Sequence, residues 1–160
     1  MVAITLVRHA TLVVEVGGVR LLVDPMLAGR DAMAPIRDST NDRRNPLVDL
    51  PAVDLDADAF LVTHLHRDHL DDVAREWLPV DRPVLCQPED ATDLEGTFDD
   101  VRSVTDRTEY ERLELVRTPA RHGHGDLAER MAPVSGFVLD DGETRVYLAG
   151  DTVWYDGVRE

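Results

Sequence analysis

The first 25 residues alternate between apolar and polar positions with the two-residue period of β-strands. This pattern predicts strands over residues 4–8, 11–16 and 19–24, which together form a meander. Gly17 and Gly18 separate the last two strands and supply the positive φ angles of a tight hairpin turn. From residue 25 to about 57 the chain is rich in Pro, Asp, Asn and Arg and keeps no period, which predicts a long loop. Loops of this length are uncommon inside a compact domain unless they serve a function such as covering a site.

The remainder of the chain mixes strand and helix patterns. An apolar run at 59–63 predicts a buried strand, and the apolar residues between Leu70 and Leu78 are spaced as on one helix face, so Trp77 and Leu78 are expected to contact the core. Further strands are expected at 84–86, 101–104, 112–117, 134–139 and 144–149, with a short helix near 88–90 and a hairpin turn at 140–142. This mixture predicts an α/β protein. A chain of 160 residues is the size of one domain, so we expect residues 1–160 to form a single domain.

The charge of the chain limits its partners. Thirty-two acidic against 17 basic residues give a net charge of −15, which repels a phosphate backbone and anionic lipid. We therefore expect a small-molecule substrate and neither nucleic acid nor a membrane as partner, while assembly into a homo-oligomer stays open. All 17 basic residues are arginine and most of the acids are aspartate, a bias that resembles proteins of salt-loving organisms.

The expected compartment of the protein and the role of its one cysteine follow from patterns that the sequence lacks. No apolar run approaches the ~20 residues that cross a bilayer, and the N-terminus lacks the pattern of a signal peptide, so we expect a cytoplasmic protein. The single cysteine, Cys86, lies in an apolar stretch without a CxxC partner and is expected to be a buried structural thiol.

The candidate chemistry is concentrated after the strand at 59–63. His64, His66, Asp68 and His69 place four ligand-type side chains within six positions, and imidazole and carboxylate are ligands that zinc accepts. On an extended turn His64 and His66 point the same way, whereas Asp68 and His69 reach toward a second point nearby. One short segment therefore offers ligands to two metal ions. The alternative is a solvated helix start with Asp68 as its N-terminal cap.

These four residues resemble the HxHxDH signature of the metallo-β-lactamase superfamily. Asp24 resembles the family's aspartate that braces the metal loop, His122 its later lone histidine ligand, and Asp151 its bridging aspartate. The segments at 134–138 and 148–152 look most like the branch that includes ascorbate-6-phosphate lactonase. The resemblance implies an αββα sandwich that covers residues 4 to 152.

The resemblance also implies a mechanism. His64, His66 and His122 would bind one metal ion, Asp68 and His69 the second, and Asp151 would bridge them. The donor types lead us to expect two Zn²⁺ ions, with Mn²⁺ or Fe²⁺ as alternatives. Two such ions lower the pKa of a shared water and polarise an ester-like centre. Asp68 is also the candidate catalytic residue, because it is placed to orient that water or take its proton. The expected activity is hydrolysis of a small ester, lactone or phosphoester.

Several other residues are candidates for contacts around the metals. His124 competes with His122 as a ligand or contacts substrate, since it follows two positions later. His9 and Asp24 are expected to act as hydrogen-bonding supports. Arg43 and Arg44 in the long loop either bind a phosphate or carboxylate or neutralise neighbouring acids on the surface. Trp154 and Tyr155 either wall the site or pack beneath it.

The chain departs from the family pattern at its end. Only nine residues follow Asp151, and none is the histidine with which family members complete the second metal site. We expect the second half of the sandwich to be incomplete, with apolar faces and a sheet edge uncovered, and we expect the sequence to be a fragment of a longer protein rather than a chain that a partner completes.

Two functions of different class are therefore compared. The first is a dinuclear hydrolase, and the second is a catalytically inactive metal-binding module or regulatory subunit that keeps only the first site. Metal content separates them, because about two equivalents with turnover indicate the enzyme and one equivalent without turnover indicates the module. A nuclease is disfavoured by the charge. An iron-based redox protein is disfavoured by His66, where the resemblance places a carboxylate in such relatives.

Overall fold

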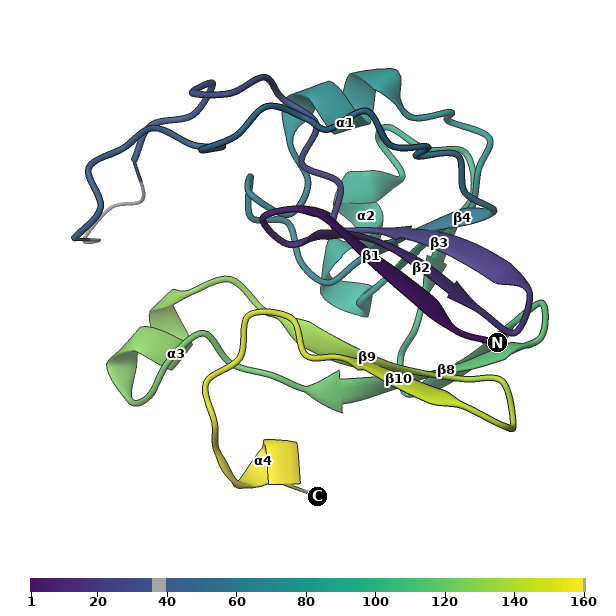
Figure 1. Cartoon of the computed structure of the whole chain (residues 1–160). Helices are drawn as coiled ribbons and strands as arrows, with labels where there is room; N and C mark the ends of the chain where they lie inside the picture. The colour runs from purple at the N-terminus through teal and green to yellow at the C-terminus, as the bar shows by residue number, and fades with distance from the viewer. Residues whose placement is uncertain (36–39, 160) are drawn as a thin grey trace.

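Two β-sheets face each other in the computed structural model, which describes residues 1–35 and 40–159 (Figure 1). The first sheet has the strand order β1-β2-β3-β4-β5-β6. Its strands are β1 (Ala3–Arg8), β2 (Thr11–Val16), β3 (Val19–Val23), β4 (Ala59–Val62), β5 (Val84–Cys86) and β6 (Val101–Ser103). The first three strands pair antiparallel, as the meander prediction requires, and β3 to β6 pair parallel. Gly17 and Gly18 have φ of 61° and 80°, which confirms the predicted hairpin turn.

The second sheet is antiparallel throughout and has the order β10-β9-β8-β7. Its strands are β7 (Arg107–Tyr110), β8 (Leu113–Pro119), β9 (Ser135–Asp140) and β10 (Arg145–Leu148). The hairpin at 140–142 is confirmed. The sequence did not predict β7, because only Tyr110 of its four residues is buried and its pattern carries no apolar run.

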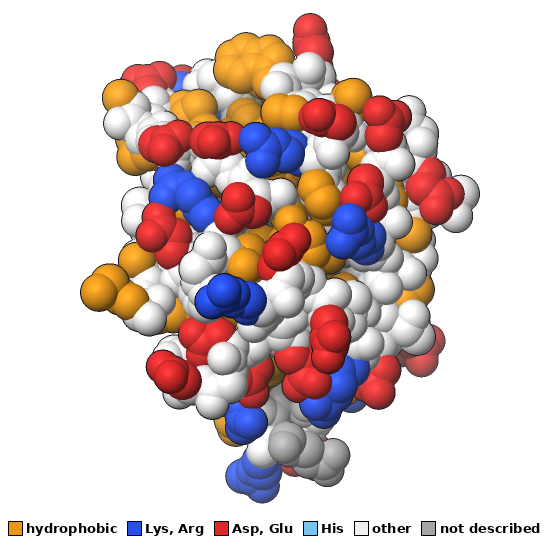
Figure 2. Space-filling model, turned by 90° about the vertical axis from the view of Figure 1, so that its right-hand side faces the viewer, with side chains coloured by type: hydrophobic (Ala, Val, Ile, Leu, Met, Phe, Trp, Pro, Cys, Tyr) orange, Lys and Arg blue, Asp and Glu red, His pale blue; other side chains and the backbone are white. Residues whose placement is uncertain are grey.

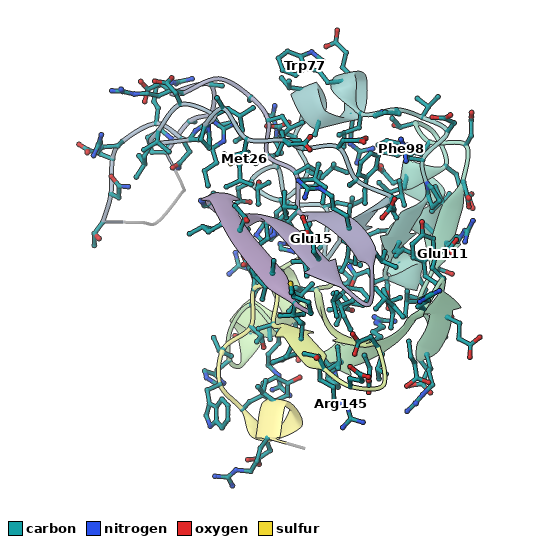
Figure 3. All side chains as sticks on the ribbon, turned by 45° about the vertical axis from the view of Figure 1, so that its right-hand side comes forward. Glu15, Met26, Trp77, Phe98, Glu111 and Arg145 are labelled. Atoms are coloured by element: carbon teal, nitrogen blue, oxygen red, sulfur yellow. The ribbon has the colours of Figure 1, made fainter. Side chains whose placement is uncertain are left out.

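Short helices cover the outer face of the first sheet (Figure 1). They are α1 (Asp72–Trp77), the 3₁₀ turn η1 (Pro88–Asp90) and α2 (Ala91–Leu94). Asp71, and not Asp68, caps α1, because its carboxylate accepts a hydrogen bond from the Ala74 N–H at 2.8 Å. The expectation that Trp77 contacts the core is wrong: α1 turns Ala74 and Leu78 toward the sheet and leaves Trp77 65% exposed, pointing outward (Figure 3).

Two apolar layers hold these elements together. One fills the space between the two sheets and includes Phe137, Leu115 and Leu21, and the other lies between the first sheet and the helices and includes Phe60 and Phe98. Cys86 is fully buried in the second layer, as predicted, and burial raises the pKa of its thiol to about 12.

The layers follow the order helix, sheet, sheet, as in the predicted αββα sandwich. On the outer side of the second sheet, the described residues place the short helix α4 (Asp156–Arg159) next to β8 (Figure 1). On the edge strand β1 of the first sheet, Ile4 is 52% and Leu6 66% exposed.

The long connection from β3 to β4 has the loop character that its composition predicts. Its described part contains an isolated bridge, in which the backbones of Met33 and Asn45 exchange hydrogen bonds of 2.7 and 3.0 Å. Residues 36–39 within it lie outside the described part. The guanidinium of Arg20 donates to the carbonyls of Asp54 and Asp56 at 2.7 Å each, and so fixes the returning half of the loop against β3.

Charge is spread over the surface as the composition predicts. On the face shown in Figure 2, carboxylates lie among arginines and scattered apolar side chains. None of the helices in the described ranges has the length and apolar character that crossing a membrane requires.

Candidate metal centre

Histidine and aspartate side chains meet at one edge of the sandwich. Parallel strands end at the same edge of a sheet, so the residues after the neighbours β3 and β4 lie side by side. In the second sheet β8 and β10 run in the same direction on either side of β9, so they also end at one edge. Asp24 follows β3, the segment His64–His69 follows β4, His122 follows β8 and Asp151 follows β10. The fold therefore brings together residues that are up to 127 positions apart, from Asp24 to Asp151.

Four of these residues form a group that could hold a metal ion. Ligand atoms of His64, His66, His122 and Asp151 all lie within 4.8 Å of one another. His64 Nε2 lies 3.0 Å from His66 Nδ1 and 3.2 Å from His122 Nε2. Nitrogens bound about 2.0–2.1 Å from one tetrahedral zinc ion stand roughly 3.3 Å apart, so the spacing and the donor types both fit a divalent cation.

His69 lies next to this group and touches two carboxylates. Its Nδ1 is 2.9 Å from Asp24 Oδ2 and its Nε2 is 3.2 Å from Asp151 Oδ1. Asp24 also accepts hydrogen bonds from the backbone N–H of Thr63 at 2.8 Å and from its hydroxyl at 2.7 Å. These bonds attach the end of β3 to the start of the histidine segment and hold the His69 ring with its Nε2 toward Asp151.

Asp68 has a different partner. Its Oδ2 lies 3.0 Å from His9 Nε2, and His9 sits in the β1–β2 turn with a left-handed φ of 50°. The pKa of Asp68 is lowered, because the hydrogen bond from His9 and the charge of His69 outweigh the effect of burial, which raises it. Asp68 is therefore ionised at neutral pH and fixed by His9, outside the group of four.

The imidazoles of the cluster differ in their affinity for protons. Burial, together with the neighbouring charges of His69 and His66, lowers the pKa of His64 to about 3. Burial and His66 also lower the pKa of His122. Burial lowers the pKa of His69 as well, but hydrogen bonds to Asp151 and Asp24 outweigh it and raise this pKa to about 10. His64 and His122 thus offer free lone pairs at neutral pH, whereas a cation at His69 has to displace a proton.

The loops that carry His122 and Asp151 are tied to each other. The N–H of Val153 donates to the carbonyl of Arg121 at 3.0 Å, and the N–H of Arg121 donates to the Thr152 hydroxyl at 3.2 Å. Gly150 precedes Asp151 with φ of 63°, and a Cβ there would lie 2.7 Å from the carbonyl oxygen of Ser135. Only glycine fits this turn without strain, so the backbone fixes where Asp151 enters the site.

The remaining predicted residues lie away from the group of four. His124 is exposed two positions beyond His122, so the structure places His122 and not His124 in the cluster. Arg44 donates to the backbone carbonyls of Asp31 and Ala32 at 2.7 and 3.1 Å, so its guanidinium braces the loop. Arg43 is exposed, and neither arginine lines the cavity over the cluster.

The aromatic residues after Asp151 do not line the cavity either. Trp154 is 69% exposed, and the ring of Tyr155 stacks beneath the guanidinium of Arg121, whose carbon is 3.7 Å from the ring centroid. Trp154 and Tyr155 were expected either to wall the site or to pack beneath it, and neither is among the described residues that line the cavity.

A cavity of about 390 Å³ opens over the histidines, and several of its walls were not predicted from the sequence. It is lined by Met33, Ala34, Asn45, His66, Arg67, Asp68, His122, Met131 and Asp151. Met33, Ala34 and Asn45 belong to the long loop, which agrees with the expectation that this loop covers a site. Single methionines in loops carry no sequence signal for a cavity wall. Larger hollows of about 520 Å³ lie elsewhere and contain no histidine.

Comparisons with known proteins identify the fold and the family of the chain. A solved structure of a possible metal-dependent hydrolase from Veillonella parvula superposes with a TM-score of 0.87 at 31% identity, over 95% of this chain and 63% of that one. The isothiocyanate hydrolase from Delia radicum gut bacteria gives a TM-score of 0.85 at 32% identity, over 97% and 64%. UPF0173 protein YddR of Bacillus subtilis is 41% identical over 166 residues, which cover 98% of this chain and 65% of that protein.

These relatives are longer than the chain, which spans a little under two thirds of their length. The fold is the metallo-β-lactamase fold, as the sequence predicted. A family model described as the beta-lactamase superfamily domain matches residues 19–160, and the chain therefore belongs to that superfamily.

Proposed function

We propose that the chain carries the metal centre of a metal-dependent hydrolase. His64, His66 and His122 would hold one divalent ion, Asp68 and His69 would hold a second, and Asp151 would serve both. The observation that carries this proposal is the group of four ligand atoms within 4.8 Å of one another. The similarity to a possible metal-dependent hydrolase and to an isothiocyanate hydrolase supports the same reaction class.

The protein's own residues prepare the centre for this chemistry. A divalent cation in the site supplies Lewis acidity, which acidifies water and polarises an electrophile. Asp24 and Thr63 hold the His69 ring, and the neutral His64 and His122 present lone pairs at neutral pH. Asp68, ionised and fixed by His9, is the residue that we propose as general base, because its carboxylate lines the cavity where substrate would lie.

We propose zinc as the metal. Three imidazoles with a carboxylate are a donor set that zinc accepts, and their spacing fits a tetrahedral ion. The substrates that we propose are small esters, lactones or phosphoesters, as the likeness to the lactonase branch implies. The similarity to the isothiocyanate hydrolase extends these classes to other electrophilic carbon centres.

Hydrolysis of 4-nitrophenyl acetate by the metal-free and the zinc-loaded chain tests this function. We expect zinc to restore turnover and His64→Ala to abolish it, since His64 has the central nitrogen of the cluster. His124→Ala is the matched control, because His124 is exposed outside the group. Turnover that is the same with and without metal, or that survives His64→Ala, would contradict the proposal.

A second function, a single-ion binding module without catalysis, is favoured by one observation. Asp68 pairs with His9 and stands outside the group of four, so the described residues gather ligands tightly around one point only. One bound equivalent of zinc with no turnover of 4-nitrophenyl acetate would support the module, and two equivalents with turnover would exclude it.

A further inference from the structure

We infer that Met33 and Met131, which line the cavity over the metal cluster from two different loops, restrict the substrate to molecules whose non-reacting part is uncharged and apolar. This inference rests on the proposed function and narrows it to neutral esters and lactones and to other neutral electrophiles. It assigns to the long loop and to the segment after α3 (Asp126–Arg130) the role of choosing the substrate.

The first argument is the composition of the cavity lining. Its described residues include four side chains of the proposed centre or next to it, His66, His122, Asp68 and Asp151. The other described lining residues are the two methionines, Ala34, Asn45 and Arg67. A volume of about 390 Å³ lies near the lower end of the roughly 300–1,000 Å³ of small-molecule sites, so a substrate bound at the centre comes close to the methionines.

The second argument is that the one cation among the described lining residues, Arg67, already has a carboxylate partner. Arg67 donates to Asp72 at 2.7 Å, and its side chain is 71% exposed to solvent. Arg44, the nearest predicted anion ligand, is bound to loop carbonyls. A carboxylate or phosphate remote from the metal would lose its hydration without gaining a partner, and that loss is costly.

The third argument is that backbone hydrogen bonds hold Met33 in place and that Met131 follows a helix directly. Met33 exchanges two backbone hydrogen bonds with Asn45, and Arg44 ties the preceding residues Asp31 and Ala32 to the same turn. Met131 directly follows α3 and is 37% exposed at the cavity. Unbranched thioether side chains adapt to apolar groups of differing shape, so we expect selection against charge rather than for one exact shape.

Two esters with the same leaving group test the inference. 4-Nitrophenyl butyrate is neutral, and mono-4-nitrophenyl succinate carries a carboxylate at the far end of an acyl chain of the same length. We expect the zinc-loaded chain to prefer the butyrate by at least about tenfold in kcat/KM, which corresponds to about 1.4 kcal/mol. Met33→Arg and Met131→Arg should each reduce this preference about tenfold or more, because they place a cation beside the succinate carboxylate.

Matched variants exclude a general effect of charge or folding. Val80→Arg adds the same charge at an exposed position outside the cavity lining and should leave the preference unchanged, as should Met131→Leu, which keeps the wall apolar. Preference for the succinate in the unmodified chain, or an unaltered preference in both arginine variants at the cavity, would overturn the inference.

A binding measurement separates this inference from the proposed function. The amide analogues N-(4-nitrophenyl)butanamide and N-(4-nitrophenyl)succinamate resist hydrolysis, and calorimetry compares their affinities for the zinc-loaded chain. If neither ester is turned over but the neutral amide binds more tightly, the proposed hydrolysis fails and the inference stands. If esters are hydrolysed and the two amides bind equally, the inference fails and the hydrolysis stands.

Discussion

Asp24→Asn tests how the buried support of the metal centre works. Asp24 is 3% exposed and accepts three hydrogen bonds: Oδ1 from the Thr63 N–H at 2.8 Å, and Oδ2 from the Thr63 hydroxyl at 2.7 Å and from His69 Nδ1 at 2.9 Å. Asparagine keeps the first acceptor but places an NH₂ group where Oδ2 was. The NH₂ donates, so His69 Nδ1 must accept, and the ring gives up its Nδ1 proton while Nε2 keeps its own.

The substitution therefore changes metal binding more than folding. Loss of a hydrogen bond to a charged group costs about 1.5–3 kcal/mol, and because the Thr63 N–H keeps its partner we expect a loss near 2 kcal/mol in the free energy of unfolding. A proton on Nε2 removes the lone pair that faces Asp151, so zinc affinity at His69 should fall roughly 10–100-fold. The zinc site at His64, His66 and His122 should keep its affinity.

Urea unfolding of the metal-free chain and calorimetric titration with zinc measure the two effects. Asp71→Asn is the matched control, because Asp71 is equally buried and accepts from the N–H groups of Ala28 and Ala74 but contacts no histidine. It should cost a comparable amount of stability and leave zinc binding intact. Normal binding of the second zinc equivalent by Asp24→Asn would refute the reasoning about the tautomer. An equal loss of zinc affinity in Asp24→Asn and Asp71→Asn would show that the loss comes from folding and not from the His69 tautomer.

Two further predictions concern the supports around the site. Gly150→Ala should lower the free energy of unfolding by about 1–3 kcal/mol and weaken zinc binding, because its φ of 63° and the carbonyl 2.7 Å from an added Cβ force the loop of Asp151 to move. Gly142→Ala is the control: its φ is 86°, but an added Cβ meets open space, so the variant should lose less stability and bind zinc normally. Equal effects of the two substitutions on zinc affinity would contradict the prediction. Burial raises the pKa of Asp90 from 3.8 to about 6, so the folded state binds the proton more tightly than the unfolded state and loses stability as pH rises from 4 to 6. Asp90→Asn should accordingly raise the free energy of unfolding by about 2 kcal/mol at pH 8 and leave it unchanged below pH 4. Urea unfolding across this pH range measures the difference, and a gain in stability that does not depend on pH would rule this cause out.

Much of the fold could be predicted because its signals are local. Gly17-Gly18 and the turn at 140–142 require hairpins, and the apolar runs at 11–16, 19–23 and 59–62 have the period or the burial of strands. The errors arose where tertiary context decides. The strand β7 carries polar residues outward on three of four positions, and Trp77 fits a helical face by spacing although α1 presents Ala74 to the sheet instead.

The candidate site was predictable as far as strand ends determine it. Asp24 and His64 follow β3 and β4, parallel neighbours that end at one edge of the first sheet, and Asp151 follows β10 of the facing sheet. The pairing of His9 with Asp68 was not predictable in detail, because it joins residues 59 positions apart through a turn in which His9 adopts a left-handed φ. Nor could spacing reveal that Arg44 would be bound to loop carbonyls, since that depends on how residues 31–45 fold back.

The central claim is that this chain forms a metal site through His64, His66 and His122. Calorimetric titration of the metal-free chain with zinc, compared with His122→Ala and His124→Ala, tests it most directly. We predict at least one tightly bound equivalent in the unmodified chain and in His124→Ala, and a loss of affinity of about 100-fold or more in His122→Ala, which removes a nitrogen 3.2 Å from His64 Nε2. Absence of zinc binding, or equal affinity in the two variants, would contradict the account.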